Sequence, residues 1–392
     1  MMSIRFHRLQ PIPPAHPRAP FPTLPVLGRM GGFSQPFAPR SRFLSPDTVF
    51  TISGKSATYW ALRDAGVAAG DEVCVPAYHC PTMVHPVLAI GAQPVMVPVG
   101  ADLAVRLAVL AGMVTERTRA VLLPHFFGYV QPEIEAILAF CRARRIVLVE
   151  DCAHAFYGGP DGPLPGSWGD YAIASTRKFF PASEGGAVVA NGRSFGQRLR
   201  RPGLVSEVRG LYDILHESAR YGALPLTGGQ PARDDARIGP ADERASAEEA
   251  APAPASEQDL RSAKSDREAL RSAVWLIRHA DHARIAAVRR RRFDQWRETI
   301  AGLRSVEAFV PAGPASQVPY VFPVRLLRPQ AQFRALKYAG VAVWRWDQLA
   351  ESDCAVSARL AVELVQMPCQ HSMPDEAFDR LLDLFRRVVG SA

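Results

Sequence analysis

Ile146-Val147-Leu148-Val149-Glu150-Asp151 is the stretch that decides the fold. Four apolar residues, three of them β-branched, are typical of a parallel strand covered on both faces. The strand ends in two acids, and such strand ends lie at the carboxyl edge of an open α/β sheet, where these sheets bind ligands. Asp151 is therefore a candidate site residue, although capping of the next turn explains this aspartate alone equally well. His154 could contact a ligand or simply be satisfied in the turn.

A second stretch, Ser175-Thr176-Arg177-Lys178, is followed by Glu184-Gly185-Gly186. Lysine is scarce in this chain, because arginine supplies every basic residue except Lys55, Lys178, Lys264 and Lys337. A guanidinium is no nucleophile, whereas a desolvated lysine amine can form a Schiff base with the aldehyde of pyridoxal phosphate. That cofactor also needs an acid beside its pyridine nitrogen, a role that Asp151 could fill. A surface lysine is the ordinary alternative.

Upstream, Thr51-Ile52-Ser53-Gly54-Lys55-Ser56 leads from a short apolar stretch into a helical pattern. A glycine lets the backbone approach a ligand, and the free N–H groups of a helix start suit a phosphate. Gly54, Lys55 and Ser56 are therefore candidate phosphate ligands. A nucleoside triphosphate loop is excluded, because the glycine that such a loop places five residues before Gly-Lys is absent.

Taken together, these stretches resemble sugar aminotransferases of the DegT/StrS type, which are pyridoxal phosphate enzymes with the aspartate aminotransferase fold. The resemblance runs in register over about residues 45–200. Further motifs that carry it are Gly70–Pro76, Gly91–Pro98, Pro124–Gly128 and Glu150–Ala155. Residues 319–325 and 367–369 resemble the small domain of that family more loosely.

The resemblance implies an α/β protein of the aspartate aminotransferase-like fold (fold type I). Its large domain would hold a mainly parallel sheet, and a small α/β domain would follow at the C-terminus. Lys178 would carry pyridoxal 5'-phosphate as a Schiff base and shuttle the proton, and Asp151 would keep the ring nitrogen protonated. The other residues predicted to bind the cofactor are Gly54, Lys55, Ser56, Cys80, His154 and Ser175. No metal is expected.

The chain also departs from the family pattern. Cys80, with His79 beside it, stands where the family usually places an aromatic residue on the cofactor ring, and Ile173 replaces a familiar serine. The Gly-x-Asn-Tyr-Arg segment that reaches the neighbouring subunit's cofactor is not recognisable between residues 200 and 300. These differences indicate a divergent branch of the family.

The function predicted first is an aminotransferase that passes an amino group from an amino acid to a keto sugar carried on a nucleotide. Another pyridoxal phosphate reaction on the same scaffold, such as a lyase or an acyl transferase, is the second possibility. Some relatives that dehydrate sugars carry histidine in place of the lysine, so Lys178 argues against that branch. A non-catalytic binding relative is the third possibility.

Composition argues against several other classes of protein, including nucleic-acid-binding, disulfide-rich, metal-binding and membrane proteins. The chain has 392 residues, 48% of them hydrophobic, which is enough for two or three domains. A net charge of +8 could attract nucleic acid, but the arginines are spread out except at Arg289–Arg292, which we interpret as a solvated helix face. Six cysteines in no paired spacing favour reduced thiols over a disulfide framework or a metal site. With no apolar stretch of 18 residues, the chain is predicted to be cytoplasmic, without membrane or nucleic-acid partners.

The domain organisation follows from changes of composition. Residues 1–44 are rich in proline and are predicted to form an extended arm without regular structure. Residues 45–227 form the large domain, with strands expected at 72–76, 94–98, 119–124, 146–150, 171–175 and 187–190. Residues 228–268 are predicted to be a polar, disordered insertion. A connecting helix over 269–303 and a small domain over 304–392 complete the chain, and the working unit is predicted to be a homodimer that the arm helps to hold together.

Overall fold

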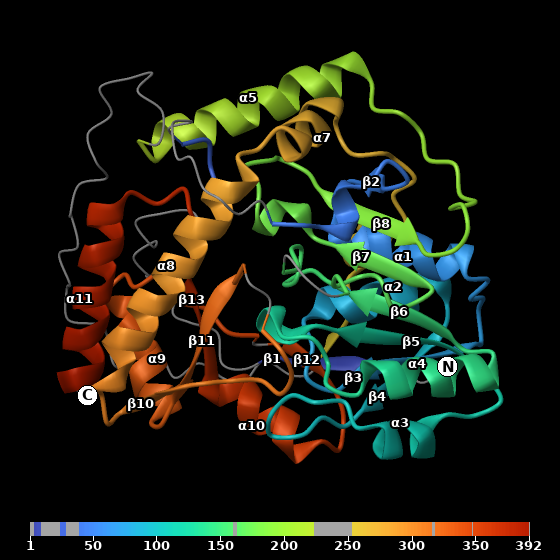
Figure 1. The fold of residues 1–392 in the computed structure, drawn as a ribbon. Helices are drawn as coiled ribbons and strands as arrows, with labels where there is room; N and C mark the ends of the chain where they lie inside the picture. The colour runs from blue at the N-terminus through green and yellow to red at the C-terminus, as the bar shows by residue number, and fades with distance from the viewer. Residues whose placement is uncertain are drawn as a thin grey trace.

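The computed structural model describes residues 4–8, 24–28, 39–159, 163–222, 253–315, 318–346 and 348–391 (Figure 1). Its main feature is a seven-stranded sheet of order β2-β8-β7-β6-β5-β3-β4. The strands are β2 Val49–Thr51, β3 Glu72–Pro76, β4 Gln93–Val97, β5 Thr118–Pro124, β6 Val147–Asp151, β7 Tyr171–Ala174 and β8 Gly186–Ala190. Strands β3 to β7 are parallel to their neighbours, and β8 pairs antiparallel with both β7 and β2. All six predicted strands are present, each within one residue at either end.

Helices cover both faces of this sheet, as a parallel sheet of buried strands requires. On one face, alternate strand residues such as Val73 and Val149 pack against α1 Gly54–Asp64 and α2 Pro81–Ile90. On the other face, Cys74 and Leu148 belong to the core cluster that includes α4 Ile134–Arg144. The short α3 Leu107–Met113 follows β4. The strands are therefore held between two helical layers, and their carboxyl ends meet at one edge.

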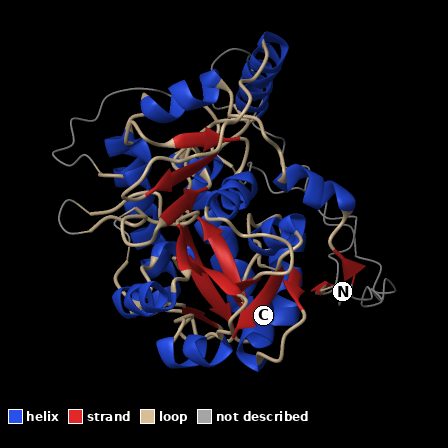
Figure 2. Ribbon diagram, turned by 90° about the vertical axis from the view of Figure 1, so that its right-hand side faces the viewer, coloured by secondary structure: helices blue, strands red, loops and turns tan. Residues whose placement is uncertain are grey.

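A second, antiparallel sheet of order β10-β11-β13 lies in the C-terminal part of the chain (Figure 2). Its strands are β10 Val306–Ala308, β11 Val321–Leu326 and β13 Leu364–Pro368. The helices around it are α8 His282–Ala301, α9 Pro329–Tyr338, α10 Ala355–Glu363 and α11 Asp375–Ser391. Trp296 of α8 and Phe378 of α11 belong to its separate hydrophobic core.

The predicted connecting helix over 269–303 is two helices, α7 Arg271–Arg278 and α8. The break falls at residues 279–281, where the Asp281 carboxylate accepts the Arg284 N–H at 2.9 Å and starts a new helix. A helix not expected in this place, α5 Leu204–Arg220, lies beside α7 (Figure 1). The carboxylate of Glu207, in the first turn of α5, accepts the Arg271 N–H at 2.6 Å and so binds the start of α7.

The expectation of no regular structure in the N-terminal arm is wrong for Arg5–Arg8. These residues form β1, the centre of a sheet with β12 Gln348–Ala350 and β9 Ala253–Pro254. The buried Phe6 ring contacts His85 edge-on, with ring centroids 5.3 Å apart, so one apolar side chain anchors the strand. Much of the arm lies outside the described residues.

The expectation of a disordered insertion is wrong for residues 253–268, which contain β9 and α6 Glu257–Ala263. Ser256 caps α6 by accepting the Asp259 N–H at 3.1 Å. The Ser265 carbonyl accepts hydrogen bonds from Ser56 and Trp60 of α1, and Ala263 is fully buried. Contacts with α1 therefore order a segment that looks polar in sequence; residues 228–252 lie outside the described residues.

The interpretation of Arg289–Arg292 as a solvated helix face is wrong for two of its residues, since Arg289 and Arg292 are 0% and 1% exposed. Arg289 donates to the backbone carbonyls of Lys178 and Tyr320 at 2.8 and 3.0 Å. Arg292 donates to the carbonyls of Gln370 and Met373 and to the Asp375 carboxylate. Arg289 therefore joins the segment that leads into β11 to the lysine turn, and Arg292 ties α8 to the segment before α11. In the described part of the chain, no helix has the length and apolar character to span a membrane.

Candidate active site

A cavity of about 350 Å³ opens at the carboxyl edge of the parallel sheet. Because β3, β6 and β7 end at this edge, the residues that follow them come together although they lie far apart in sequence. Seven of the eight predicted site residues line the cavity: Gly54, Lys55, Cys80, Asp151, His154, Ser175 and Lys178. The parallel-sheet topology therefore gathers the residues that the sequence motifs single out.

Lys178 ends the 3-10 turn η3 Thr176–Lys178 that follows β7. Its Nζ lies 5.2 Å from the centre of the Tyr320 ring, a distance at which a cation is attracted to an aromatic face. Burial lowers the pKa of the Lys178 amine, while the neighbouring Cys80 and Asp151 act in the opposite direction. The position therefore favours a neutral, nucleophilic amine more than a surface position would.

Asp151 is the last residue of β6 and is 7% exposed. One carboxylate oxygen, Oδ1, accepts the Ala153 N–H at 2.8 Å, which fixes the side chain. Burial raises the pKa of Asp151, and the charge of Lys178 opposes this rise. An acid held at the cavity wall with a raised pKa is suited to share a proton with a basic ligand atom.

His154 reaches the cavity from the turn after β6 and is surrounded by aromatic rings. Its Nδ1 accepts the Phe127 N–H at 3.2 Å, which indicates that the neutral ring carries its proton on Nε2. Burial lowers the pKa of His154 well below its usual value, and Lys178 adds to this effect. The ring lies 4.6 Å from that of Tyr320, and Phe127 adopts a left-handed backbone (φ 55°) that directs its N–H at His154.

Cys80 lines the cavity, but its neighbour His79 does not. His79 is buried behind the site, where its Nε2 accepts the Ala350 N–H at 3.0 Å and its Nδ1 contacts the Cys80 carbonyl at 3.1 Å. Of the two residues considered for contact with a cofactor ring, only the thiol is placed at the cavity.

The start of α1 forms one end of the cavity. A Cβ on Gly54 would meet Ser175 Cβ at 3.2 Å, which is tighter than an ordinary contact, so glycine favours the close packing of this turn. Lys55 Nζ pairs with Asp259 of α6 at 3.3 Å. Ser56 is not among the lining residues, because its buried hydroxyl donates to the Ser265 carbonyl at 3.0 Å. The predicted role of Ser56 in cofactor binding therefore gains no support from its position.

Several lining residues carry no motif that points to a site. Tyr320, Trp344 and Trp346 come from the C-terminal part of the chain, where the family resemblance is loose. The only signal is the pair of closely spaced tryptophans. Arg177, beside the lysine, also lines the cavity, and its buried Nε has no hydrogen-bond partner among the described residues.

Within the described residues, His125, Glu150 and Cys152 form a buried group with metal-ligand spacing. The hydrogen bonds of Glu150 explain this group without an ion. One carboxylate oxygen accepts from Trp168 and Gly169 N–H, and the other accepts from Gly166 N–H and contacts His125 Nε2 at 2.9 Å. Glu150 thereby supports the loop behind Asp151.

The lining residues fit pyridoxal phosphate. The unpartnered Arg177 Nε, the amine of Lys55 and the start of α1 suit a phosphate, since each offers positive charge or N–H donors. Lys178 and Asp151 line the same cavity, so that, with the cofactor bound, the amine would be available to its aldehyde and the carboxyl group to its ring nitrogen. The rings of His154 and Tyr320 offer flat surfaces at the same cavity.

Residues 42–209 match the sequence pattern of the DegT/DnrJ/EryC1/StrS aminotransferase family. This region of the chain is therefore similar to that family. Two relatives from the family's range of activities are an L-glutamine:scyllo-inosose aminotransferase from Streptomyces griseus and a GDP-perosamine synthase from Vibrio cholerae. The first is 36% identical over 142 residues, 36% of this chain and 33% of that protein. The second is 29% identical over 182 residues, 45% of this chain and 49% of that protein. The chain thus matches between a third and half of the length of these relatives.

A solved structure extends the likeness to both parts of the fold. A putative sugar aminotransferase from Streptococcus pneumoniae, in its pyridoxal phosphate form, superposes with a TM-score of 0.59 and 18% sequence identity. The superposition covers 91% of this chain and 94% of that chain. The predicted aspartate aminotransferase-like fold is confirmed, and the match of residues 42–209 to the DegT/DnrJ/EryC1/StrS aminotransferase family supports pyridoxal phosphate as the cofactor.

Proposed function

We propose that this chain is a pyridoxal phosphate-dependent aminotransferase that aminates a keto sugar, carried on a nucleotide, with an amino acid as donor. The observation that carries the proposal is the meeting of Lys178 and Asp151 at one cavity within the region that matches the family. Relatives that act on a cyclic polyol ketone or belong to nucleotide-sugar pathways support the acceptor class.

Bound through the Lys178 amine as a Schiff base, the cofactor would supply an electron sink for the bond that is broken at the donor's α-carbon. Lys178 Nζ, whose pKa burial lowers, would move the proton once the donor's amino group has displaced it from the cofactor and left it as a free amine. The Asp151 carboxylate would hold a proton on the ring nitrogen, and its Oδ1 bond to Ala153 N–H would keep it oriented. The aromatic wall of Tyr320, Trp344 and Trp346 would exclude water.

The test is the donor half of the reaction. Purified protein loaded with the cofactor is mixed with L-glutamate or L-glutamine, and release of the 2-oxo acid is measured together with loss of the visible cofactor band. The proposal predicts one equivalent of 2-oxo acid per site, none from Lys178→Ala, and an unchanged yield from Lys264→Ala, which removes an exposed lysine. Ammonia release or carbon–carbon cleavage instead would identify a lyase, and no reaction with any amino acid would favour a non-catalytic relative.

We further propose that the working unit is a cytoplasmic homodimer. All six cysteines are free thiols, which is compatible with a reducing compartment. An apolar face of α5 supports self-association, because six large hydrophobic residues are exposed on one side of this helix: Leu204, Val205, Val208, Leu211, Tyr212 and Leu215. The described part of the arm pairs with β12 of its own chain, so α5 is a better candidate for the contact than the arm.

A further inference from the structure

A buried amide without a partner lies beside the candidate site. Gln366 belongs to β13 and is 3% exposed, and neither its Oε1 nor its Nε2 has a hydrogen-bond partner among the described residues. Its backbone N–H donates to the Trp344 carbonyl at 2.7 Å, so only the side chain is left unsatisfied. Burial of an unpaired amide costs free energy, so the amide of Gln366 needs a hydrogen-bond partner from outside the protein, such as a bound ligand.

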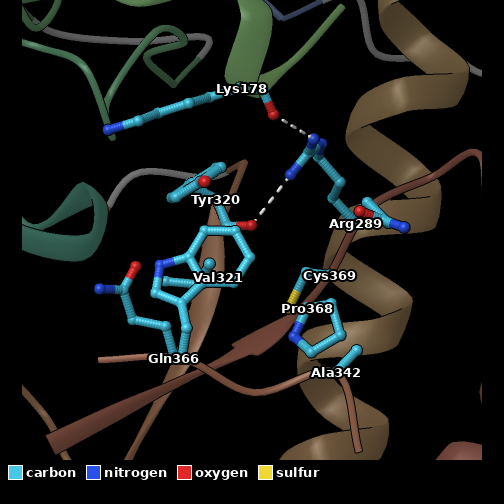
Figure 3. Close-up of a pocket in the computed structure, with 10 residues that line it drawn as sticks. Lys178, Arg289, Tyr320, Val321, Ala342, Gln366, Pro368 and Cys369 are labelled. Carbon is cyan, nitrogen blue, oxygen red and sulfur yellow. Dashed lines mark hydrogen bonds between the residues drawn. The ribbon is translucent and has the colours of Figure 1, made fainter. Parts of the chain in front are cut away.

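The amide faces a space that it shares with the candidate catalytic lysine. A cavity of about 20 Å³ is lined by Gln366, Lys178, Tyr320 and Trp344, among others. Lys178, Tyr320 and Trp344 also line the main cavity, so the two spaces are adjacent. In Figure 3 the Gln366 amide and the Lys178 side chain extend toward the same side of Tyr320. The small space alone holds about one water-sized group, so a larger ligand would reach the amide from the adjacent main cavity.

The hydrogen-bond chemistry of the amide narrows what that group can be. A primary amide combines an acceptor oxygen with an N–H donor. A carboxylate only accepts and an ammonium only donates, so either would leave one amide atom unpaired. A hydroxyl group does both, and two hydroxyls on neighbouring ring carbons can pair both amide atoms together. The aromatic side chains of Tyr320, Trp344 and Trp346 provide apolar area against the C–H face of such a ring.

We propose that Gln366 is a specificity-determining residue that binds a pair of neighbouring hydroxyl groups on a saturated ring. The amino-group acceptor would then be a polyhydroxylated ring and not a simple keto acid. This inference rests on the proposed function, because it names what the acceptor must carry.

The test uses an inert ligand, so that binding is measured apart from turnover. The full chain is loaded with pyridoxamine 5'-phosphate, and tryptophan fluorescence follows the binding of scyllo-inositol, which carries a hydroxyl on every ring carbon, or of cyclohexanol, which carries one. We expect wild type to prefer scyllo-inositol and Gln366→Met to reduce that affinity by about tenfold or more, since two hydrogen bonds are lost. Binding of cyclohexanol should not change.

A stability measurement separates a ligand-binding amide from a structural one. Methionine has a similar volume and no unpaired polar atoms, so Gln366→Met should unfold at the same temperature as wild type or higher. Gln330→Met, on exposed α9 surface of the same domain, is the control and should change neither property. The inference is overturned if Gln366→Met keeps the preference for scyllo-inositol, or if it loses stability while its binding is unchanged. Failure of the donor half-reaction alongside an intact, Gln366-dependent preference would instead reject the proposed function and leave the hydroxyl-binding site standing.

Discussion

At the scale of single residues, we propose that Asp151 holds a proton on the ring nitrogen of the cofactor and that Lys178 transfers the proton of the substrate. Asp151→Asn should still bind the cofactor but lose turnover by orders of magnitude, because an amide cannot hold the ring nitrogen protonated. Steady-state kinetics and cofactor titration measure the two effects separately. Activity within about threefold of wild type, a barrier change of ~0.7 kcal/mol, would show that another acid has this role.

The lowered pKa of Lys178 predicts a specific pH dependence for cofactor attachment. Only the neutral amine attacks the aldehyde, so the rate should rise with pH and level off clearly below 10.5, the ordinary value for lysine. Stopped-flow absorbance of the cofactor-free protein mixed with pyridoxal phosphate gives the profile, with Nα-acetyl-lysine as the reference amine. A midpoint equal to that of the reference amine would contradict the desolvated environment of Lys178.

His79 is one of several buried histidines that make the stability of the fold sensitive to acid. Burial lowers the pKa of His79 from 6.5 to about 4, and protonation of Nε2 would break its bond from Ala350 N–H. The folded pKa is the lower one, so this stabilisation is present above pH 6.5 and is lost as the pH falls toward 4. The shift corresponds to about 3 kcal/mol.

Thermal unfolding between pH 8 and pH 4 tests this linkage. Wild type should lose stability steeply below pH 6.5, and His79→Gln, although less stable at pH 8, should lose less over the same range. Parallel curves for the two proteins would assign the acid sensitivity to the other buried histidines.

The candidate site could be predicted from sequence only in part, and particular residues show why. Asp151 and Lys178 follow strands whose apolar runs are unmistakable, so their common edge could be inferred. Ser56 could not be judged, because the group that occupies its hydroxyl comes from Ser265, more than two hundred residues away. Gln366 and the cavity tryptophans lie on segments whose position depends on packing between the two sheets.

At the scale of elements, α6 sets the charge at the proposed phosphate end of the site. Asp259 pairs with Lys55 at 3.3 Å and lies 3.6 Å from His85, so its carboxylate competes with any anion for Lys55. Asp259→Asn should therefore bind pyridoxal phosphate several-fold more tightly, at a stability cost of about 0.5 kcal/mol for a partly exposed ion pair. Equilibrium dialysis and urea unfolding measure these changes.

Glu257→Gln is the matched control, because it removes an exposed α6 carboxylate that pairs only with Arg261 among the contacts at this helix. It should leave cofactor affinity unchanged. Weaker binding by Asp259→Asn would mean that the carboxylate positions Lys55 and does not compete for it.

Strands were predictable within a residue because buried apolar runs define them, whereas α6 was not. Its polar sequence resembles a disordered linker, and its order comes from contacts of α6 and the following turn with α1 and α2, which the local sequence does not indicate. The prediction of a single helix over 269–303 was wrong for a related reason. The helical periodicity of the sequence continues through Asp281, although Asp281 caps the start of a new helix.

At the scale of the whole molecule, the exposed apolar face of α5 predicts a twofold dimer. Light scattering should report about twice 42.8 kDa for wild type. Leu211→Glu places a charge in that face and should shift the protein toward the monomer, while Arg209→Ala, an exposed change on the same helix, should not. A Leu211→Glu protein that remains fully dimeric would place the interface elsewhere.

Attachment of the cofactor to Lys178 can be tested by borohydride reduction followed by peptide mass mapping. Reduction fixes the cofactor to whichever amine carries it. We predict a single pyridoxyl adduct, located on Lys178, in protein purified with pyridoxal phosphate. An adduct on Lys55 instead, or no adduct in protein that is fully folded, would contradict it.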